Sequence, residues 1–293
     1  MFEKEIEQYD HLAAQYLEKV AKPMGNEEFR KHSEIIFSCH SCGIEGSTFS
    51  VDDTRALFEQ GLGYYPVGKT LLECQEMADH FKAYEWMHDQ LGHPFDVQLL
   101  KDINRLVTLN TLPYRVPGAV PGEFTTVDMA AGDTLFGDHE KLIVQVPRLM
   151  ESTARAMNQD EIHPLVLAAR FHGYFEYLHP FRDGNGRTGR LLSNFILLQK
   201  KLPELIIFKE DRQQYIDALR AKRTEGTDEY LIAFFFKAAI KQMQDELNQK
   251  KNGSRPMLFF RAKSNNRNCP KADAKNKDHW FLGKAPLEAA GSH

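Results

Sequence analysis

Apolar residues recur every three or four positions along most of the chain, the spacing of helices that bury one face. The clearest case begins at Pro164, a favoured first helical residue, and ends before Pro180. The same periodicity is found at residues 2–21, 70–90, 146–157, 187–201, 211–222 and 227–249. The pattern predicts a mainly α-helical fold with few strands.

Three stretches depart from this periodicity. Residues 91–124 are rich in Gly and Pro, which predicts a long loop interrupted by helical pieces. Residues 123–138 predict a short β-hairpin, with strands at 124–127 and 134–136. Residues 251–293 are polar and aperiodic, which predicts a flexible tail.

Composition fits a folded globular protein: 42% of the 293 residues are apolar, and the formal net charge is −4. The tail carries nine Lys and Arg against three Asp and Glu, so the rest of the chain is strongly acidic. This balance excludes a wholly basic nucleic-acid binder, and we expect no specific nucleic-acid partner. No apolar run approaches the roughly 18–20 residues of a membrane span, and the charged start does not resemble a signal peptide. Four cysteines do not form a disulfide framework, so a cytoplasmic location is expected.

The join between two predicted helices reads HPFRDGNGRTGR, from His179 to Arg190. Gly184 and Gly186 lack a Cβ, so their backbone N–H groups can approach an anion at the start of the second helix. Asn185 adds an amide donor. Arg187 and Arg190 are three residues apart and share one helix face. The spacing predicts a site for a polyphosphate.

Two further side chains of this join suit a reaction on that polyphosphate. Asp183 is a hard oxygen ligand of the kind that Mg²⁺ shares with substrate phosphates. His179 can act as a general base near neutral pH. A tight turn with solvated arginines is the structural alternative. The residues favour a site for Mg²⁺ and a nucleotide.

The same stretch matches the signature His-x-Phe-x-Asp/Glu-Gly-Asn-Gly-Arg-x-x-Arg, and the chain therefore resembles the Fic-domain proteins. The resemblance implies a helical bundle with a short β-hairpin flap, in which AMP passes from ATP to a protein hydroxyl. It implies His179 as the base, Asp183 as the Mg²⁺ ligand, and Gly184 to Gly186 as the anion site. Arg187 and Arg190 would hold the β- and γ-phosphates. The related Doc proteins, which phosphorylate, have Lys in place of the second loop glycine, so Gly186 favours adenylylation.

An upstream motif, Ser41-Cys42-Gly43-Ile44-Glu45-Gly46, resembles the inhibitory Ser/Thr-x-x-x-Glu-Gly/Asn motif of the same family. On its own it is a helix end capped by Gly46. The resemblance implies that Glu45 pairs with Arg190 and displaces the γ-phosphate, with Ser41 opening the motif. In some relatives this glutamate instead positions a water that removes AMP, and this alternative stays open.

The predicted hairpin falls where Fic proteins carry a flap that holds the target by strand addition. Family members often have Pro-Gly-x-Tyr-Arg at its start. Here Gly122 and the aromatic Phe124 are kept, whereas Thr125 stands in place of the Arg. These three residues are the expected target-docking positions.

We therefore expect a self-inhibited protein adenylyltransferase with ATP as substrate, Mg²⁺ as cofactor, and a protein target bearing Ser, Thr or Tyr. The expected regions are an N-terminal helical region (1–89), a Fic core (90–250) and the basic tail (251–293). Removal of AMP, transfer of another phosphoryl group, and ATP sensing without turnover are the alternatives. The target, the activating signal and a homo-oligomer are left open.

Overall fold

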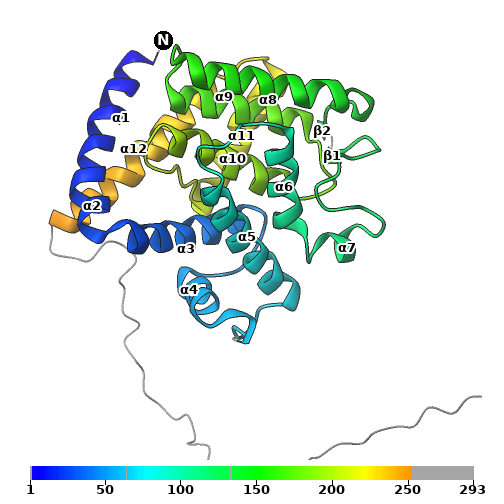
Figure 1. Cartoon of the computed structure of the whole chain (residues 1–293), viewed down its shortest axis with the longest axis horizontal. Helices are drawn as coiled ribbons and strands as arrows, with labels where there is room; N and C mark the ends of the chain where they lie inside the picture. Colours follow the sequence, from blue (N-terminus) through cyan, green and yellow to red (C-terminus); the bar gives the residue numbers. More distant parts are fainter. Residues whose placement is uncertain (1, 64, 132–133, 252–293) are drawn as a thin grey trace, which may run out of the picture. The chain divides into compact units, whose positions relative to one another are not determined.

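A computed structural model describes residues 2–63, 65–131 and 134–251, and the predicted tail from residue 252 onward lies outside the described residues. The mainly helical prediction is confirmed (Figure 1). The α-helices are, in chain order, α1 (Glu3–Tyr16), α2 (Lys22–Met24), α3 (Asn26–Ile44), α4 (Val51–Gln60), α5 (Leu71–Asp89), α6 (Val97–Thr108), α7 (Leu112–Arg115), α8 (Leu142–Gln159), α9 (Pro164–Leu178), α10 (Asn185–Gln199), α11 (Arg212–Thr224) and α12 (Glu229–Lys251). Shorter elements are the π-turn η1 (Leu17–Ala21), the 3₁₀ turns η2 (Gly61–Gly63), η3 (His139–Lys141) and η4 (Lys209–Asp211), and strands β1 (Ala130–Ala131) and β2 (Thr134–Leu135).

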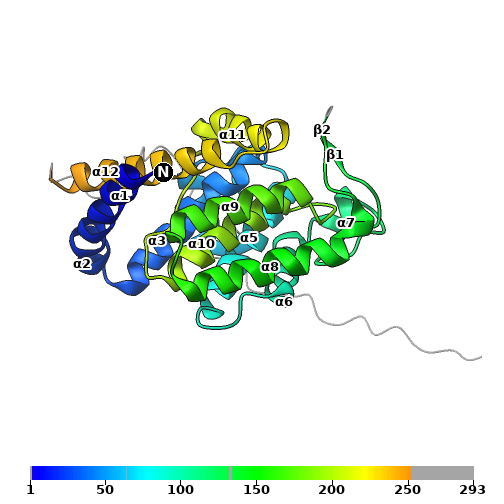
Figure 2. The same cartoon turned by 90° about the horizontal axis from the view of Figure 1, so that it is seen from above.

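Helices α9 and α10 lie at the centre of the packing. Helix α9 contacts α8, α10, α11 and α12, and α10 contacts α3, α5 and α6 (Figure 2). Phe171 and Phe175 of α9 and Phe195 of α10 are fully buried between these helices. The loop between α9 and α10 is therefore held between two well-packed helices.

The N-terminal helices are packed onto this centre. Helix α1 lies beside α12 in both views of the chain (Figures 1 and 2), and Tyr16 donates a hydrogen bond to Glu246 across this contact. Helix α3 packs against α5, and both reach α10. Residues from α3 and α5 can therefore take part in a site formed at α10.

The segment at 91–124 is more regular than expected. It contains α6, a helix of three turns that is capped by Asp96, whose side chain accepts a hydrogen bond from the Leu99 N–H. The Gly and Pro residues that suggested a loop flank this helix on both sides. A side-chain cap of this kind is a common helix start, and it outweighs the nearby helix breakers.

The hairpin exists, but its predicted first strand is wrong. The strands are β1 and β2, which pair in antiparallel fashion with Ala130 opposite Leu135. Residues 124–127 form no strand of this hairpin, because their backbone pairs elsewhere: Phe124 forms an isolated antiparallel bridge with Phe181, and the Thr125 N–H donates to Pro180 O at 2.8 Å. These backbone groups therefore pair with the loop before α10 and not with the second strand of the hairpin.

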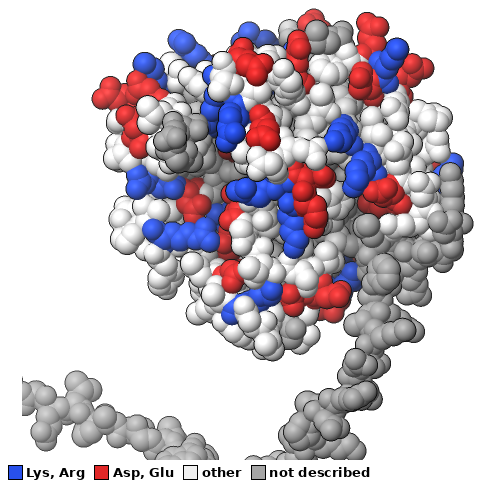
Figure 3. Space-filling model, turned by 180° about the vertical axis from the view of Figure 1, so that it is seen from behind, with Lys and Arg blue, Asp and Glu red and all other residues white. Residues whose placement is uncertain are grey.

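Charged side chains of both signs are scattered over the face shown in Figure 3. On this face, Lys and Arg alternate with Asp and Glu, and the described residues form no continuous basic area there.

Among the described helices, none combines the length and the apolar character that a membrane span requires. Cys39, Cys42 and Cys74 are buried free thiols.

Candidate active site

The predicted site begins where α9 ends. His179 caps this helix in the left-handed conformation, with φ +48°, and so turns the chain sharply into the loop. Phe181 is buried and anchors the loop in the core. Asn185 holds the loop closed, because its side chain accepts from the Phe181 N–H at 3.0 Å and donates to Phe181 O at 2.8 Å. The Asn185 amide is thereby committed to the loop itself.

The loop fits closely against α6. Gly184 has φ +78°, and a Cβ there would lie 2.6 Å from Thr108 Cγ2. Asn104 of α6 donates to Asp183 O at 3.0 Å and to Thr188 Oγ1 at 3.2 Å. Only glycine permits both the backbone conformation and this approach.

Helix α3 brings the upstream motif to the same place. Arg190 Nη2 lies 2.7 Å from Glu45 Oε1 and donates to Ser41 O at 2.8 Å, and Arg190 Nε donates to Ser41 Oγ at 3.1 Å. Burial alone would lower the pKa of Arg190, but the Glu45 carboxylate outweighs it and holds this pKa above its usual value. A Cβ on Gly186 would collide with Glu45 Oε1, so this carboxylate lies directly over the first turn of α10.

A buried histidine supports Ser41 from the other side. His80 of α5 lies between Ser38 Oγ, at 2.9 Å from its Nδ1, and Ser41 Oγ, at 3.1 Å from its Nε2. Burial, together with the charges of Arg187 and Arg190, lowers the pKa of His80 well below its usual value. A neutral imidazole therefore connects α3 to α5 beside the Glu45–Arg190 pair.

Arg187 is paired with carboxylates. Its side chain is 1% exposed, and it lies 2.6 Å from Glu76 Oε1 of α5 and 3.1 Å from Asp183 Oδ1. Burial would lower the pKa of Arg187, whereas Glu76 and Asp183 raise it, and the net change is upward. Arg187 is thus a fully charged group that holds Asp183 in place.

Two side chains, Phe136 and Glu176, contact the His179 ring. Phe136, next to β2, stacks on its ring with centroids 3.8 Å apart, and the Arg223 guanidinium lies 4.1 Å from the Phe136 centroid. Glu176, one turn earlier on α9, has Oε2 3.7 Å from His179 Nδ1. Burial would raise the pKa of Glu176, but His179, His172 and Arg190 together lower it to about 2. Since Nδ1 faces this carboxylate, Nε2 is the ring nitrogen left for a substrate.

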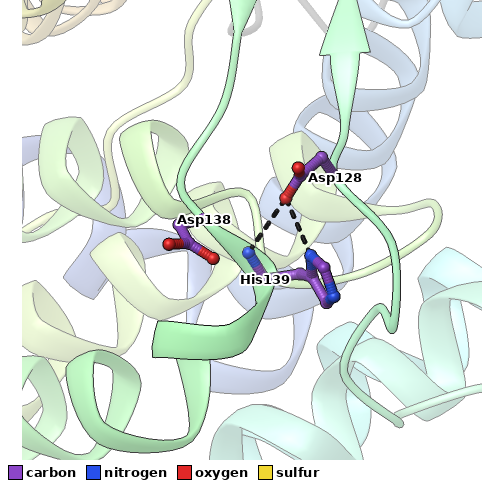
Figure 4. Close-up of side chains that lie close together, drawn as sticks. All are labelled: Asp128, Asp138 and His139. Carbon is purple, nitrogen blue, oxygen red and sulfur yellow. Dashed lines mark hydrogen bonds and ion pairs between the residues drawn. The ribbon is translucent and has the colours of Figure 1, made fainter.

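The base of the hairpin is clasped by a small cluster of polar side chains (Figure 4). Asp128 accepts hydrogen bonds from the His139 backbone N–H at 3.2 Å and from His139 Nδ1 at 2.8 Å. Asp138 caps the following turn through the Glu140 N–H and pairs with Lys141. Because Asp128 and His139 are bonded to each other and Asp138 is bonded within its own turn, we interpret the cluster as one that holds the two ends of the hairpin together.

The predicted docking residues lie between this hairpin and α6. Gly122 packs so closely on α6 that a Cβ would lie 2.7 Å from Lys101 O. The Phe124 ring lies 5.5 Å from that of Phe181, and Thr125 turns back through its Oγ1 to Val127 O. All three positions contact the α9–α10 loop or α6, so they fix the start of the hairpin.

A cavity of about 290 Å³ opens over these groups. It is lined by His179, Gly186, Arg190 and Glu45 on one side and by apolar and basic residues of α11 on the other. Asp183 and Arg187 do not line it. A larger hollow of about 530 Å³ near His93 and Lys200 contains no comparable set of reactive groups, so the chemistry favours the smaller cavity.

The structure thus brings together the predicted loop, His179 to Arg190, and the two residues of the upstream motif, Ser41 and Glu45. Sequence reasoning missed the partners that hold them: Glu76, Phe136, Glu176 and also Arg115, whose Nη1 lies 3.2 Å from Asp183 Oδ2. A charged residue on an otherwise buried helix face could have indicated Glu76. Arg115 and Phe136 belong to segments without periodicity, where the sequence carries no comparable signal.

Sequence comparisons identify known proteins that are similar to this chain. The Fic/DOC family profile matches residues 94–197. A protein adenylyltransferase Fic from Culex quinquefasciatus is 32% identical over 200 residues, which cover 67% of this chain and 38% of the relative. The chain therefore spans less than half the length of this curated relative.

Solved structures show the same fold. A Fic domain containing signaling protein from Bacteroides thetaiotaomicron superposes with a TM-score of 0.72 at 19% identity, over 85% of this chain and 97% of that one. Fic-1 from C. elegans gives 0.69 at 23% identity, over 86% and 73%. Through residues 94–197, with the complete signature at its α9–α10 loop, the chain belongs to the Fic/DOC family.

Proposed function

We propose that this chain transfers AMP from ATP to a hydroxyl group of a target protein and that Glu45 restrains this activity. The observation that carries the proposal is the convergence of His179, Gly186, Arg190 and Glu45 on one cavity at the N-terminus of α10. The curated relatives named protein adenylyltransferase support the same activity. A cytoplasmic location stays a prediction.

In this mechanism His179 Nε2 accepts the proton of the target Ser, Thr or Tyr hydroxyl. The hydroxyl oxygen forms a bond to the α-phosphorus of ATP, the bond from that phosphorus to the bridging oxygen breaks, and pyrophosphate leaves. Glu176 faces Nδ1 and stabilises the positive charge that develops on the ring. The N–H groups of the first turn of α10 face the anion, and Arg190 offers its guanidinium to the leaving phosphates.

The carboxylate of Asp183 fits a magnesium ion. Mg²⁺ is usually held by one or two carboxylates together with substrate phosphates, and Asp183 Oδ2 already lies 3.2 Å from a cationic group, Arg115 Nη1. Bound there, Mg²⁺ would neutralise part of the phosphate charge. Arg187 and Arg115 hold this carboxylate at the edge of the anion site.

The position of Glu45 supports the proposed autoinhibition. Its carboxylate occupies the Arg190 guanidinium and lies over Gly186, which is where a phosphate would bind. The Glu45 side chain is 35% exposed, so it can move aside without breaking the core. Displacement of Glu45 would expose both the guanidinium and the helix N-terminus.

The hairpin offers a surface for the target. Its backbone lies next to His179 through Phe136, and Gly122, Phe124 and Thr125 fix its start. A segment of the target that pairs with this hairpin would place its hydroxyl near His179.

The test uses the Glu45→Gly protein, a protein lysate, and ATP labelled in the α- or the γ-phosphate. Label from the α-phosphate should appear on protein, and label from the γ-phosphate should not. Adding His179→Ala to this background should abolish transfer. ATP binding without transfer would instead indicate a sensing module, and transfer of γ-label would indicate a kinase.

A further inference from the structure

Two arginines and two carboxylates form a closed ring beside the α9–α10 loop. Arg187 contacts Glu76 Oε1 at 2.6 Å and Asp183 Oδ1 at 3.1 Å. Arg115 takes the other oxygen of each acid, with Nη2 2.5 Å from Glu76 Oε2 and Nη1 3.2 Å from Asp183 Oδ2. Two positive and two negative charges thus balance within the ring. Of its members, Glu76 and Arg115 lie outside the signature.

The position of Arg115 is fixed by α5. Asn110, five residues earlier, donates to Asp79 from its backbone N–H at 2.8 Å and from its side-chain amide at 2.6 Å. Asp79 and Glu76 are one turn apart on α5, and both are buried. One face of α5 therefore holds residues 110–115 at two points, Asn110 and Arg115, and places the Arg115 guanidinium beside Asp183.

Both oxygens of Asp183 already have nitrogen partners. Oδ1 accepts from the Gly184 N–H at 2.6 Å and from Arg187, and Oδ2 faces Arg115. A divalent cation needs one of these oxygens. The Arg187 side chain is 1% exposed, whereas that of Arg115 is 32% exposed. Arg115 is therefore the partner that can withdraw without breaking the core.

We propose that Arg115 is a positioning residue that sets the affinity of Asp183 for a divalent cation, by holding Oδ2 until the cation takes it. This inference rests on the proposed role of Asp183 as the metal ligand. Glu76 holds the two arginines in place and supplies the negative charge that offsets them.

The charges of the ring predict that removing the charge of Arg115 and removing that of Glu76 change the affinity for a cation in opposite directions. Without the Arg115 charge, two carboxylates face one arginine, and the excess negative charge attracts a cation. Without the Glu76 charge, two arginines face one carboxylate, and a cation is repelled. Damage to the structure alone would weaken cation binding in both variants. The sign of the effect separates an electrostatic role from a structural one.

The experiment titrates Mn²⁺ into the full chain and follows the free ion by electron paramagnetic resonance, without nucleotide. The variants are Arg115→Gln, Arg115→Lys, Glu76→Gln and Asp183→Asn. The control, Arg105→Gln, breaks a comparable guanidinium–aspartate pair on the exposed face of α6. We expect Arg115→Gln to bind Mn²⁺ about tenfold tighter and Glu76→Gln about tenfold more weakly. Arg115→Lys and Arg105→Gln should remain within about twofold of the wild type.

The outcomes separate this inference from the proposed function. If Asp183→Asn abolishes binding while Arg115→Gln binds Mn²⁺ no more tightly than the wild type, the metal site stands and the role of Arg115 is overturned. If Asp183→Asn leaves Mn²⁺ binding unchanged, the proposed metal site and the inference both fail. Should Arg115→Gln not fold, a Glu76→Gln protein that binds Mn²⁺ as tightly as the wild type overturns the inference equally.

Discussion

Phe136 and His179 stack with their ring centroids 3.8 Å apart and their planes 19° from parallel. Phe136 belongs to the hairpin segment, and His179 ends α9. The contact therefore ties the hairpin to the candidate base, and Arg223 closes the other face of the Phe136 ring. The hairpin is further fixed by the Gly137 N–H, which donates to Tyr177 O at 3.0 Å.

Phe136→Ala should lower AMP transfer to protein about three- to tenfold, because an aromatic stack of this kind contributes about 0.5–1.5 kcal/mol. ATP affinity should not change, since the substitution leaves untouched the groups that are expected to bind the phosphates of ATP. Steady-state kinetics and ATP titration measure the two quantities. Leu135→Ala, an exposed residue of the same hairpin, is the control. An equal loss in both variants would show that the stack itself is unimportant.

Ser41→Ala should partly release the restraint by Glu45. The substitution removes the oxygen that accepts from Arg190 Nε, so Arg190 is held less firmly beside Glu45. A hydrogen bond to a charged group contributes about 1.5–3 kcal/mol, so ATP should bind about tenfold tighter, with less effect than Glu45→Gly. Calorimetric ATP titration gives the affinity. Ser38→Ala also loses a contact to His80 but none to Arg190, and the same gain in that variant would contradict this prediction.

The sequence predicted the central helices within a few residues, because their apolar spacing and their Pro and Gly boundaries are local signals. It predicted the hairpin less well. Residues 124–127 have the composition of a strand, but their backbone partners, Pro180 and Phe181, lie more than fifty positions away. Strand pairing depends on such partners more than on local preference.

The difference between local signals and partners that are distant in the sequence also applies to the site. A short signature shows which reactive residues lie together, and the resemblance adds Glu45. The counter-ions come from elsewhere: Glu76 lies on α5 and Arg115 on α7, and neither is marked by spacing. Arg187 shows the consequence. The sequence suggests a guanidinium that is free to bind phosphate, whereas in the fold its charge is balanced by the carboxylates of Glu76 and Asp183.

Asn185→Ala should destabilise the protein by about 2–3 kcal/mol, because it leaves the Phe181 N–H and C=O buried without their partners. For a chain of this size that corresponds to a fall in Tm of roughly 5–10 °C. Thermal unfolding followed by circular dichroism measures the change. The control is Asn158→Ala, at an exposed position of α8. Identical melting of the Asn185 variant and the wild type would exclude the proposed locking of the loop.

Glu246 predicts a dependence of stability on pH. It is buried in α12, where burial raises its pKa to about 7 although Tyr16 donates a hydrogen bond to it. The raised pKa means that the folded protein holds this proton more tightly than the unfolded chain. The associated stability is fully present below about pH 4.5, and it is lost as the pH rises through about 7.

Glu246→Gln removes this titration while keeping an acceptor for Tyr16. We expect the free energy of unfolding of the wild type to fall between pH 5 and pH 8, relative to the variant, by on the order of 3 kcal/mol. Urea unfolding at four pH values across this range measures the difference. Glu151→Gln, at an exposed position of α8, should follow the wild type. Parallel pH profiles for the wild type and Glu246→Gln would mean that Glu246 is already ionised in the folded protein at pH 5.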